Sequence, residues 1–244
     1  MGKRAVPSQS VITRIQRDPF MPVTAQTSRR AFLAGAASLA GLALSGCAVS
    51  GGSRRIAQAA PQFSDYYLQM YGPLPNEKFP VPAVDLTQLK PSHFRTEIAD
   101  PTGERAGTIV VDTGARYAYL VQEGGRAIRY GVGIGRDGFT WQGRADIARK
   151  AAWPTWTPPR EMIERQPEVA EFANGMPGGL DNPLGARALY IYRNGRDTIY
   201  RLHGTGEVWS IGEAVSSGCV RFLHHDIIDL YNRTPVGAPI LVYT

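Results

Sequence analysis

A cysteine late in the chain, Cys219, follows a histidine, His203, by sixteen positions, and a thiol enzyme needs these two residue types. Thiolate is the attacking form of cysteine, and histidine is its usual base because imidazole titrates near neutral pH. Gly218 directly precedes Cys219, and glycine lets the backbone turn sharply and a substrate approach closely. Backbone N–H groups in such a turn can hold the oxyanion that forms when a thiolate adds to a carbonyl. On spacing alone, however, a cysteine between glycine and Val220 is more often a small core residue.

Two short motifs around this pair resemble the signature of the L,D-transpeptidase catalytic domain, the YkuD-like family. They are His203-Gly204-Thr205 and Ser216-Ser217-Gly218-Cys219-Val220-Arg221. A Val-Asp hairpin near residue 112 and the Asn-Pro-Leu-Gly segment at 182–185 are similar to the family as well. The resemblance covers about residues 101–244. It implies a mainly β fold, an L,D-transpeptidase-like sandwich or barrel with one or two short helices, and an acyltransferase that needs no cofactor.

The resemblance also implies roles for individual residues. Cys219 would attack the carbonyl that precedes the terminal D-amino acid of a peptidoglycan stem peptide, and His203 would take the thiol proton and later return one to the leaving amine. The carbonyl of Gly204 would orient the imidazole, and the N–H groups of Gly218 and Cys219 would form the oxyanion hole. Arg221 would hold a substrate carboxylate through a bidentate contact.

One position departs from the family pattern. A second histidine usually stands immediately before the glycine of the second motif, and here that place is Ser217. His203 is retained as the base, so the change bears on local support of the loop, on rate and on substrate preference. We expect Ser217 to help orient the site, and Ser216 and Thr205 to contact the substrate.

Nearby residues also resemble parts of a metal site and of a dinucleotide-binding loop, but neither pattern is complete. A metal site could be assembled from His203, Cys219, His224, His225 and Asp226. Adjacent histidines point about 100° apart on a helix, however, so no metal is expected. The glycines at 131–135 resemble a dinucleotide-binding loop, but no helix follows them. The tryptophans at 141, 153, 156 and 209 are assigned to packing, and those at 153 and 156 could also line a glycan or peptide groove.

The net charge of +6 does not indicate nucleic-acid binding, because the excess is confined to one end. Residues 1–47 hold six Lys or Arg and one acid, which leaves 21 basic and 20 acidic residues in 48–244. The expected folded part therefore has no global field that would attract a polyanion.

Residues 1–47 read as an export signal. Arg29-Arg30 precedes an Ala- and Gly-rich apolar run that is too short and too glycine-rich for a membrane span. The pair resembles the twin-arginine type of signal. Leu44-Ser45-Gly46-Cys47 resembles a lipoprotein processing box, which predicts lipidation of Cys47; an ordinary cleavage site, before Ala48 or around residues 57–59, is the alternative. Met21 would give a more compact leader as an alternative start. We therefore expect a periplasmic or cell-envelope enzyme, where neither ATP nor reduced nicotinamide is at hand.

The rest of the chain is expected to form a tether, an arm and a catalytic domain. Residues 48–62 are rich in Gly, Ser, Ala and Gln, which is typical of a flexible tether, and an irregular Tyr- and Pro-rich arm follows to about residue 100. In the domain at 101–244, β-rich runs separated by turns predict an antiparallel meander at 108–112, 117–122 and 128–134, with further strands at 187–192, 198–202 and 238–243. Helices are expected only at 160–173 and 225–232.

Two other functions remain open from the sequence. Water could replace the acceptor amine, which would make the protein a hydrolase of the same peptide bond. Alternatively, the domain could bind the wall without catalysis, with an inert thiol at Cys219. The reactivity of Cys219 separates the last alternative from the two enzymatic ones.

Overall fold

The computed structural model describes residues 62–135, 141–216 and 218–244. Residues 57–244 cluster as one compact unit. The expected export signal with Cys47, nearly all of the tether, and Ser217 lie outside the described residues. In the described ranges, no helix has both the length and the apolar character that a bilayer crossing requires.

One mixed sheet of nine strands organises the domain, in the order β1-β4-β3-β2-β11-β6-β7-β8-β10. In chain order the strands are β1 (Thr96–Ala99), β2 (Ile109–Asp112), β3 (Tyr117–Gln122), β4 (Arg126–Gly131), β6 (Gly143–Ala152), β7 (Arg187–Arg193), β8 (Arg196–Thr205), β10 (Val220–Leu223) and β11 (Pro239–Tyr243). The pairs β8–β10 and β2–β11 are parallel, and the other pairs in this sheet are antiparallel. A separate parallel pair joins β5 (Ile134–Gly135) to β9 (Ala214–Ser216).

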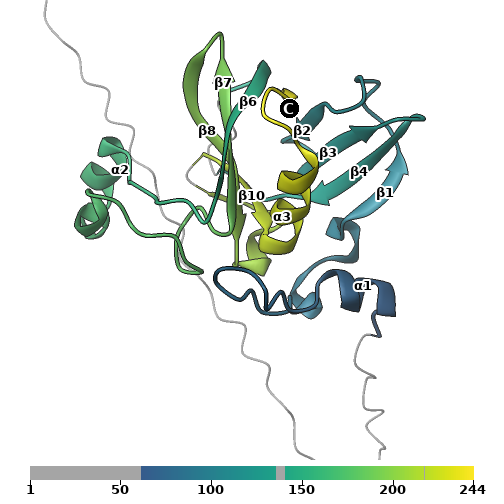
Figure 1. Ribbon diagram of the computed structural model, residues 1–244, viewed down its shortest axis with the longest axis horizontal. Helices are drawn as coiled ribbons and strands as arrows, with labels where there is room; N and C mark the ends of the chain where they lie inside the picture. Colours follow the sequence, from purple (N-terminus) through teal and green to yellow (C-terminus); the bar gives the residue numbers. More distant parts are fainter. Residues whose placement is uncertain (1–61, 136–140, 217) are drawn as a thin grey trace, which may run out of the picture. The chain divides into compact units, whose positions relative to one another are not determined.

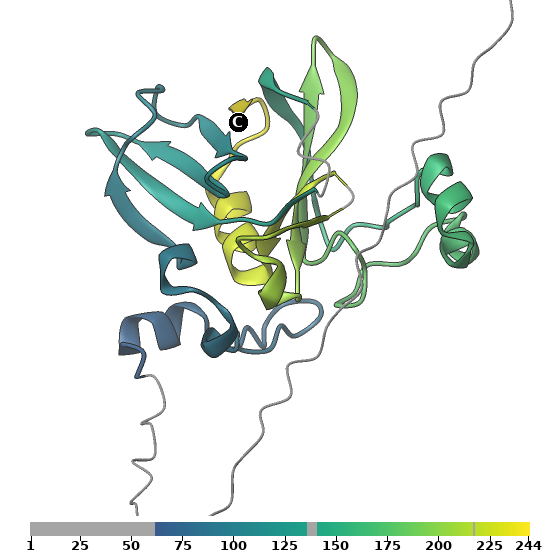
Figure 2. The same cartoon turned by 180° about the vertical axis from the view of Figure 1, so that it is seen from behind.

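The sheet curves around helix α3 (His224–Arg233), which lies between its two halves in both views (Figure 1, Figure 2). Alternate residues of the strands point at this helix and form the main core with Ile227 and Leu230. Strand β2 is buried along Ile109, Val110 and Val111, because its other face is covered by a second cluster. Such continuous apolar runs are typical of strands covered on both faces.

The expected mainly β fold with few short helices is confirmed, while individual elements differ from the expectation. The expected antiparallel meander is found in β2, β3 and β4, while the sheet as a whole is mixed because two other strand pairs are parallel. Strand β6 was not predicted, because its exposed positions carry charged residues and break the apolar signal. The helix expected at 160–173 is divided into α2 (Arg160–Arg165) and a 3-10 segment at Pro167–Phe172. Pro167 has no N–H to continue the helical hydrogen bonds.

The segment before the sheet is packed against the domain. It contains α1 (Asp65–Met70) and 3-10 turns at Leu86–Gln88 and Pro91–His93. Its buried apolar residues cluster with Leu223, at the end of β10, and with Ile211. Tyr71 donates a hydrogen bond to the buried carboxylate of Asp226 on α3. Strand β1 already begins at Thr96, before the boundary that we expected at residue 101.

Candidate active site

His203 lies in β8, and Cys219 directly precedes β10, the neighbouring parallel strand. In the β8–β10 ladder, Val220 lies opposite Leu202 and Arg221 lies opposite His203. Leu202 and Val220 are fully buried in the main core, so His203 and Arg221 leave the other face of the sheet. Cys219 directly precedes β10, two positions before Arg221, and therefore shares that face. Standard strand spacings put the Cα atoms of His203 and Cys219 about 8 Å apart, within reach of their side chains.

The imidazole of His203 is held in one tautomer. Its Nδ1 lies 3.0 Å from the carbonyl oxygen of Gly204, which can only accept, so Nδ1 carries the hydrogen and Nε2 is left to take a proton. Burial lowers the pKa of His203 to about 4; the hydrogen bond to Gly204 opposes this shift, and the positive charge of Arg221 adds to it. The ring is therefore neutral at physiological pH and able to act as a base.

Cys219 follows a backbone turn that requires glycine. Gly218 has a φ of +129°, which side-chain-bearing residues rarely adopt, and a Cβ there would meet the ring of Tyr200 at 3.9 Å. Cys219 itself is half-buried and forms no disulfide. Burial raises the pKa of its thiol, while a hydrogen bond from the Arg201 backbone and the charges of Arg201 and Arg221 lower it. The pair is therefore thiol and neutral imidazole at neutral pH, and the proton must move when a carbonyl substrate arrives.

Close packing behind His203 fixes the strand that carries it. The N–H of Gly204 donates to the carbonyl of Leu184 at 3.1 Å. A Cβ on Gly204 would come within 2.7 Å of the His224 ring, and one on Gly185 would come within 2.6 Å of the Gly204 oxygen. Only glycine fits at both positions, so the Asn-Pro-Leu-Gly segment supports the catalytic strand directly.

Asn182 holds together the long connection between β6 and β7. Its amide nitrogen donates to the carbonyls of Pro154, Met176 and Pro177 at 2.9–3.1 Å, and its oxygen accepts from the N–H of Leu184. The side chain is buried with the residue only 4% exposed. This single residue therefore ties the connection to the segment that supports His203.

Arg221 already has a partner beside the site. Its guanidinium forms an ion pair with the carboxylate of Glu207, in the turn that follows β8. Thr205, which we expected to contact substrate, accepts the N–H of Glu207 with its hydroxyl at 3.1 Å and so holds this turn. Ser216 ends β9. Glu207 was not among the residues we selected from sequence, although an acid four positions after His203 was a visible signal.

A row of arginine and tyrosine side chains extends from the nucleophile across the same face. Arg201 is opposite position 219 by register, and it forms a bidentate ion pair with Asp197 at 2.6 and 2.7 Å. Its guanidinium carbon lies 4.6 Å from the ring centre of Tyr190, and that of Arg149 lies 3.6 Å from the same centre. The row keeps positive charge next to Cys219, which favours the thiolate form.

The residues considered for a metal have other neighbours. His225 donates from Nε2 to the carbonyl of Gly72 at 2.7 Å, while His224 accepts from the N–H of Ala186 at 3.4 Å. Within the described ranges, no group of three or more His, Cys, Asp or Glu side chains is arranged to hold a metal ion. Trp153 is buried and donates to Glu77, whereas Trp209 is 55% exposed on the turn that follows Glu207.

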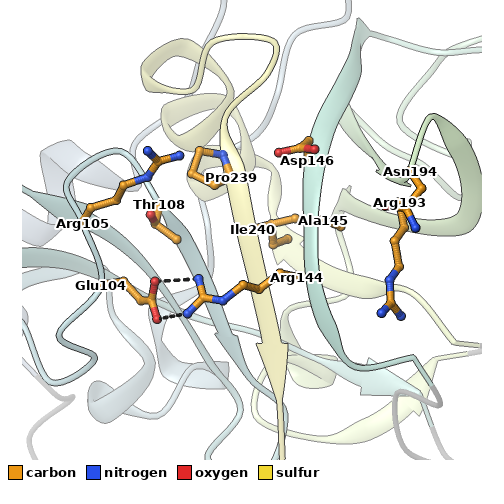
Figure 3. Close-up of a pocket in the computed structure, with 10 residues that line it drawn as sticks. All are labelled: Glu104, Arg105, Thr108, Arg144, Ala145, Asp146, Arg193, Asn194, Pro239 and Ile240. Carbon is orange, nitrogen blue, oxygen red and sulfur yellow. Dashed lines mark hydrogen bonds and ion pairs between the residues drawn. The ribbon is translucent and has the colours of Figure 1, made fainter.

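A surface pocket of about 430 Å³ lies over β11, away from this constellation (Figure 3). Its lining includes the bidentate ion pair between Arg144 and Glu104, with N–O distances of 2.7 and 2.8 Å. Arg105 and Arg193 lie on opposite sides of it. None of the residues singled out from the two sequence motifs lines this pocket.

The fold and the site define a mixed β-sheet domain with a histidine in one strand and a cysteine directly before the neighbouring strand. The family model of the L,D-transpeptidase catalytic domain, YkuD, matches residues 106–242. The chain therefore belongs to this family, as the sequence motifs predicted.

Individual relatives agree with this assignment. A "Putative L,D-transpeptidase in ATP synthase subunits region ORF 5" from Fuscovulum blasticum is 34% identical over 137 residues, which cover 55% of this chain and 68% of the relative. "Probable L,D-transpeptidase YbiS" from Escherichia coli K12 is 34% identical over 145 residues. That match covers 57% of this chain and 45% of the relative, so the aligned part spans less than half of the longer protein.

Two solved structures match this chain with TM-scores below 0.5. A Brucella melitensis crystal structure described as a "Probable carnitine operon oxidoreductase caia" is 42% identical, covers 63% of this chain and 95% of its own, and has a TM-score of 0.45. An L,D-transpeptidase from Mycobacterium smegmatis is 22% identical, with coverages of 56% and 58% and a TM-score of 0.39. The family assignment rests on the sequence comparisons.

Proposed function

We propose that this protein is a cysteine-dependent L,D-transpeptidase of the bacterial cell wall. In the proposed reaction, Cys219 attacks the carbonyl before the terminal D-amino acid of a peptidoglycan stem peptide. The terminal D-amino acid leaves, and an acceptor amine then resolves the thioester. Membership of the family and the location of Cys219 beside His203 on one sheet face support the proposal.

The proton transfers follow from the arrangement of His203. Its Nε2 takes the thiol proton as the sulfur adds to the carbonyl, and the imidazolium gives that proton to the departing amine. Its low pKa favours this return, because the imidazolium is then a strong acid. The N–H groups of Gly218 and Cys219 are assigned to the oxyanion, and Gly204 is assigned to orienting the ring through the hydrogen bond described above.

Reaction of Cys219 with a stem peptide tests the proposal. Incubation with a disaccharide tetrapeptide should add the acyl mass to the protein and release one D-amino acid, as measured by intact-protein mass spectrometry. Cys219→Ala should acquire no added mass while keeping its circular dichroism spectrum. An unreactive wild-type thiol, toward both the tetrapeptide and a carbapenem, would overturn catalysis in favour of a wall-binding role. Product analysis with and without added D-amino acid distinguishes transfer from hydrolysis.

We also propose that the protein is exported and anchored in the cell envelope through Cys47. The twin arginine, the short apolar run and the cysteine at its end support this assignment. Cell fractionation of wild type and Cys47→Ala tests it. The wild type should be found in the membrane fraction and the variant in the soluble envelope fraction, and equal distribution of the two would contradict lipidation.

A further inference from the structure

Glu207 places a carboxylate at the edge of the site without belonging to either motif. Its Oε2 accepts a hydrogen bond from Nη1 of Arg221, which is the cross-strand partner of His203. The side chain of Glu207 is 50% exposed and that of Arg221 is 23% exposed, so both groups are accessible from solvent. The second oxygen of Glu207, Oε1, accepts no hydrogen bond within the described ranges.

The turn that carries Glu207 is held by three hydrogen bonds. Its N–H donates to the hydroxyl of Thr205 at 3.1 Å, and its carbonyl accepts from the N–H and the hydroxyl of Ser210 at 3.0 and 2.7 Å. Val208 and Ile211, next in the turn, pack against the buried cluster formed by the segment before the sheet. The backbone that carries the carboxylate is therefore ordered before a ligand binds, which reduces the conformational entropy lost on binding.

An accessible arginine beside an accessible glutamate matches one class of small molecule in particular. The guanidinium suits a carboxylate, and the free oxygen of the glutamate suits an ammonium group. A zwitterionic α-amino acid carries both groups a few bonds apart. A solvent-accessible ion pair of this kind contributes little to stability, so little free energy is lost when a ligand separates the two side chains.

We propose that Arg221 and Glu207 together bind the zwitterion of an α-amino acid, with Glu207 holding the amino group of the acceptor. The inference rests on the proposed function and extends it to the second half-reaction. The D-amino acid released from the stem and the acceptor that replaces it would use the same pair. An exposed tryptophan, Trp209, stands two residues further along the same turn.

The proposed transfer balances without another reactant. The bound ammonium loses one proton to water, and the resulting amine stays hydrogen-bonded to Glu207. Its nitrogen attacks the thioester carbon, the C–N bond forms, and the bond from that carbon to the sulfur of Cys219 breaks. The second proton passes from the nitrogen through His203 to the sulfur, so the products are an amide and a thiol.

Glu207→Gln tests this inference because it keeps the size of the side chain and removes its charge. The purified full chain would be given a disaccharide tetrapeptide and D-methionine. Intact-protein mass spectrometry would follow the acyl-enzyme, and chromatography would measure the ratio of D-methionine-exchanged product to hydrolysed tripeptide. We expect this ratio to fall at least about tenfold, a change equivalent to one weakened charged contact, while acylation stays within about threefold of wild type.

Two matched variants complete the experiment. Glu213→Gln removes a similarly exposed carboxylate, 44% exposed and paired with Lys90, from the same connection, and should leave the ratio unchanged. Glu207→Asp keeps the charge and should restore part of the exchange. An unchanged ratio in Glu207→Gln would overturn the inference. If acylation were slowed at the same time, Glu207 would act on the donor through Arg221 instead. A wild-type protein that forms no acyl-enzyme would instead refute the proposed function on which the inference depends.

Discussion

His203 and Arg221 are paired across the parallel ladder between β8 and β10, and their side chains leave the same face of the sheet. The preceding pair, Leu202 and Val220, points into the core with no exposed surface. Because side chains alternate along a strand, burial of Leu202 and Val220 puts the imidazole of His203 and the guanidinium of Arg221 side by side on the other face. The positive charge of Arg221 adds to burial in lowering the pKa of His203.

The first prediction concerns the pH dependence of thiol reactivity. Burial raises the pKa of Cys219 and lowers that of His203 to about 4, so thiol and imidazole are both neutral between these values. The rate of alkylation by iodoacetamide should therefore rise only at alkaline pH, in a single step above the ordinary thiol pKa. Mass spectrometry of the alkylated protein at successive pH values measures this. A reactive plateau near pH 5 would indicate a preformed thiolate–imidazolium pair and contradict the prediction.

The second prediction concerns Gly185. A methyl group there would lie 2.5 Å from the His224 ring and 2.6 Å from the Gly204 oxygen, on a backbone with φ of +59°. Gly185→Ala should displace the strand end that carries His203 and reduce the acylation rate by about 10² or more, as small misplacements of catalytic groups do. Gly179→Ala is the matched control in the same connection, because nothing lies within 4 Å of its Cβ. Equal acylation rates for both variants would count against support of His203 by this segment.

The third prediction concerns Asp226, which is fully buried near Tyr71, Arg95 and Asp229. Burial raises the pKa of its carboxyl to about 7. The folded state therefore holds the proton more tightly than the unfolded state does. The resulting stabilisation is complete below about pH 4, the ordinary pKa, and is lost as pH rises through about 7.

Asp226→Asn should remove this dependence. Between pH 5 and pH 8, the free energy of unfolding of the variant should increase relative to that of wild type by about 1–3 kcal/mol, because only wild type loses stability. Urea denaturation at the two pH values measures the difference. A constant difference between the two proteins would show that the carboxyl does not titrate in this range.

The fourth prediction concerns the segment before the sheet. Phe94 is 3% exposed and its ring packs against those of Phe63, Tyr67 and Tyr71, in the cluster that also contains Ile211. Phe94→Ala should lower the free energy of unfolding by about 3–5 kcal/mol. It should also expose the turn around Glu207 to limited proteolysis. Leu68→Ala, at a position that is 51% exposed, should change stability by less than about 0.5 kcal/mol, and a similar loss in both would contradict a packed segment.

Several elements follow from local patterns in the sequence. Alternating or continuous apolar runs bounded by Gly-rich turns predicted β2, β3, β7, β8 and β11 close to their observed bounds. The two motifs led to the family, which the match at 106–242 confirmed. The glycine before Cys219 predicted a turn, and Gly218 indeed has a positive φ. Each of these patterns lies within a few neighbouring residues, so it can be recognised from the sequence alone.

The sequence by itself therefore determined the reactive residue types, the family and most of the strands, because residue chemistry and side-chain alternation are local properties. Only the tertiary structure decided that Glu207 forms an ion pair with Arg221. It also decided that the segment before the sheet packs against the turn carrying Glu207, and that Gly185 and Gly204 leave room for the ring of His224. Each of these contacts joins residues far apart in the chain or on separate turns. They depend on strand order and packing of the whole sheet, which no short stretch of sequence specifies.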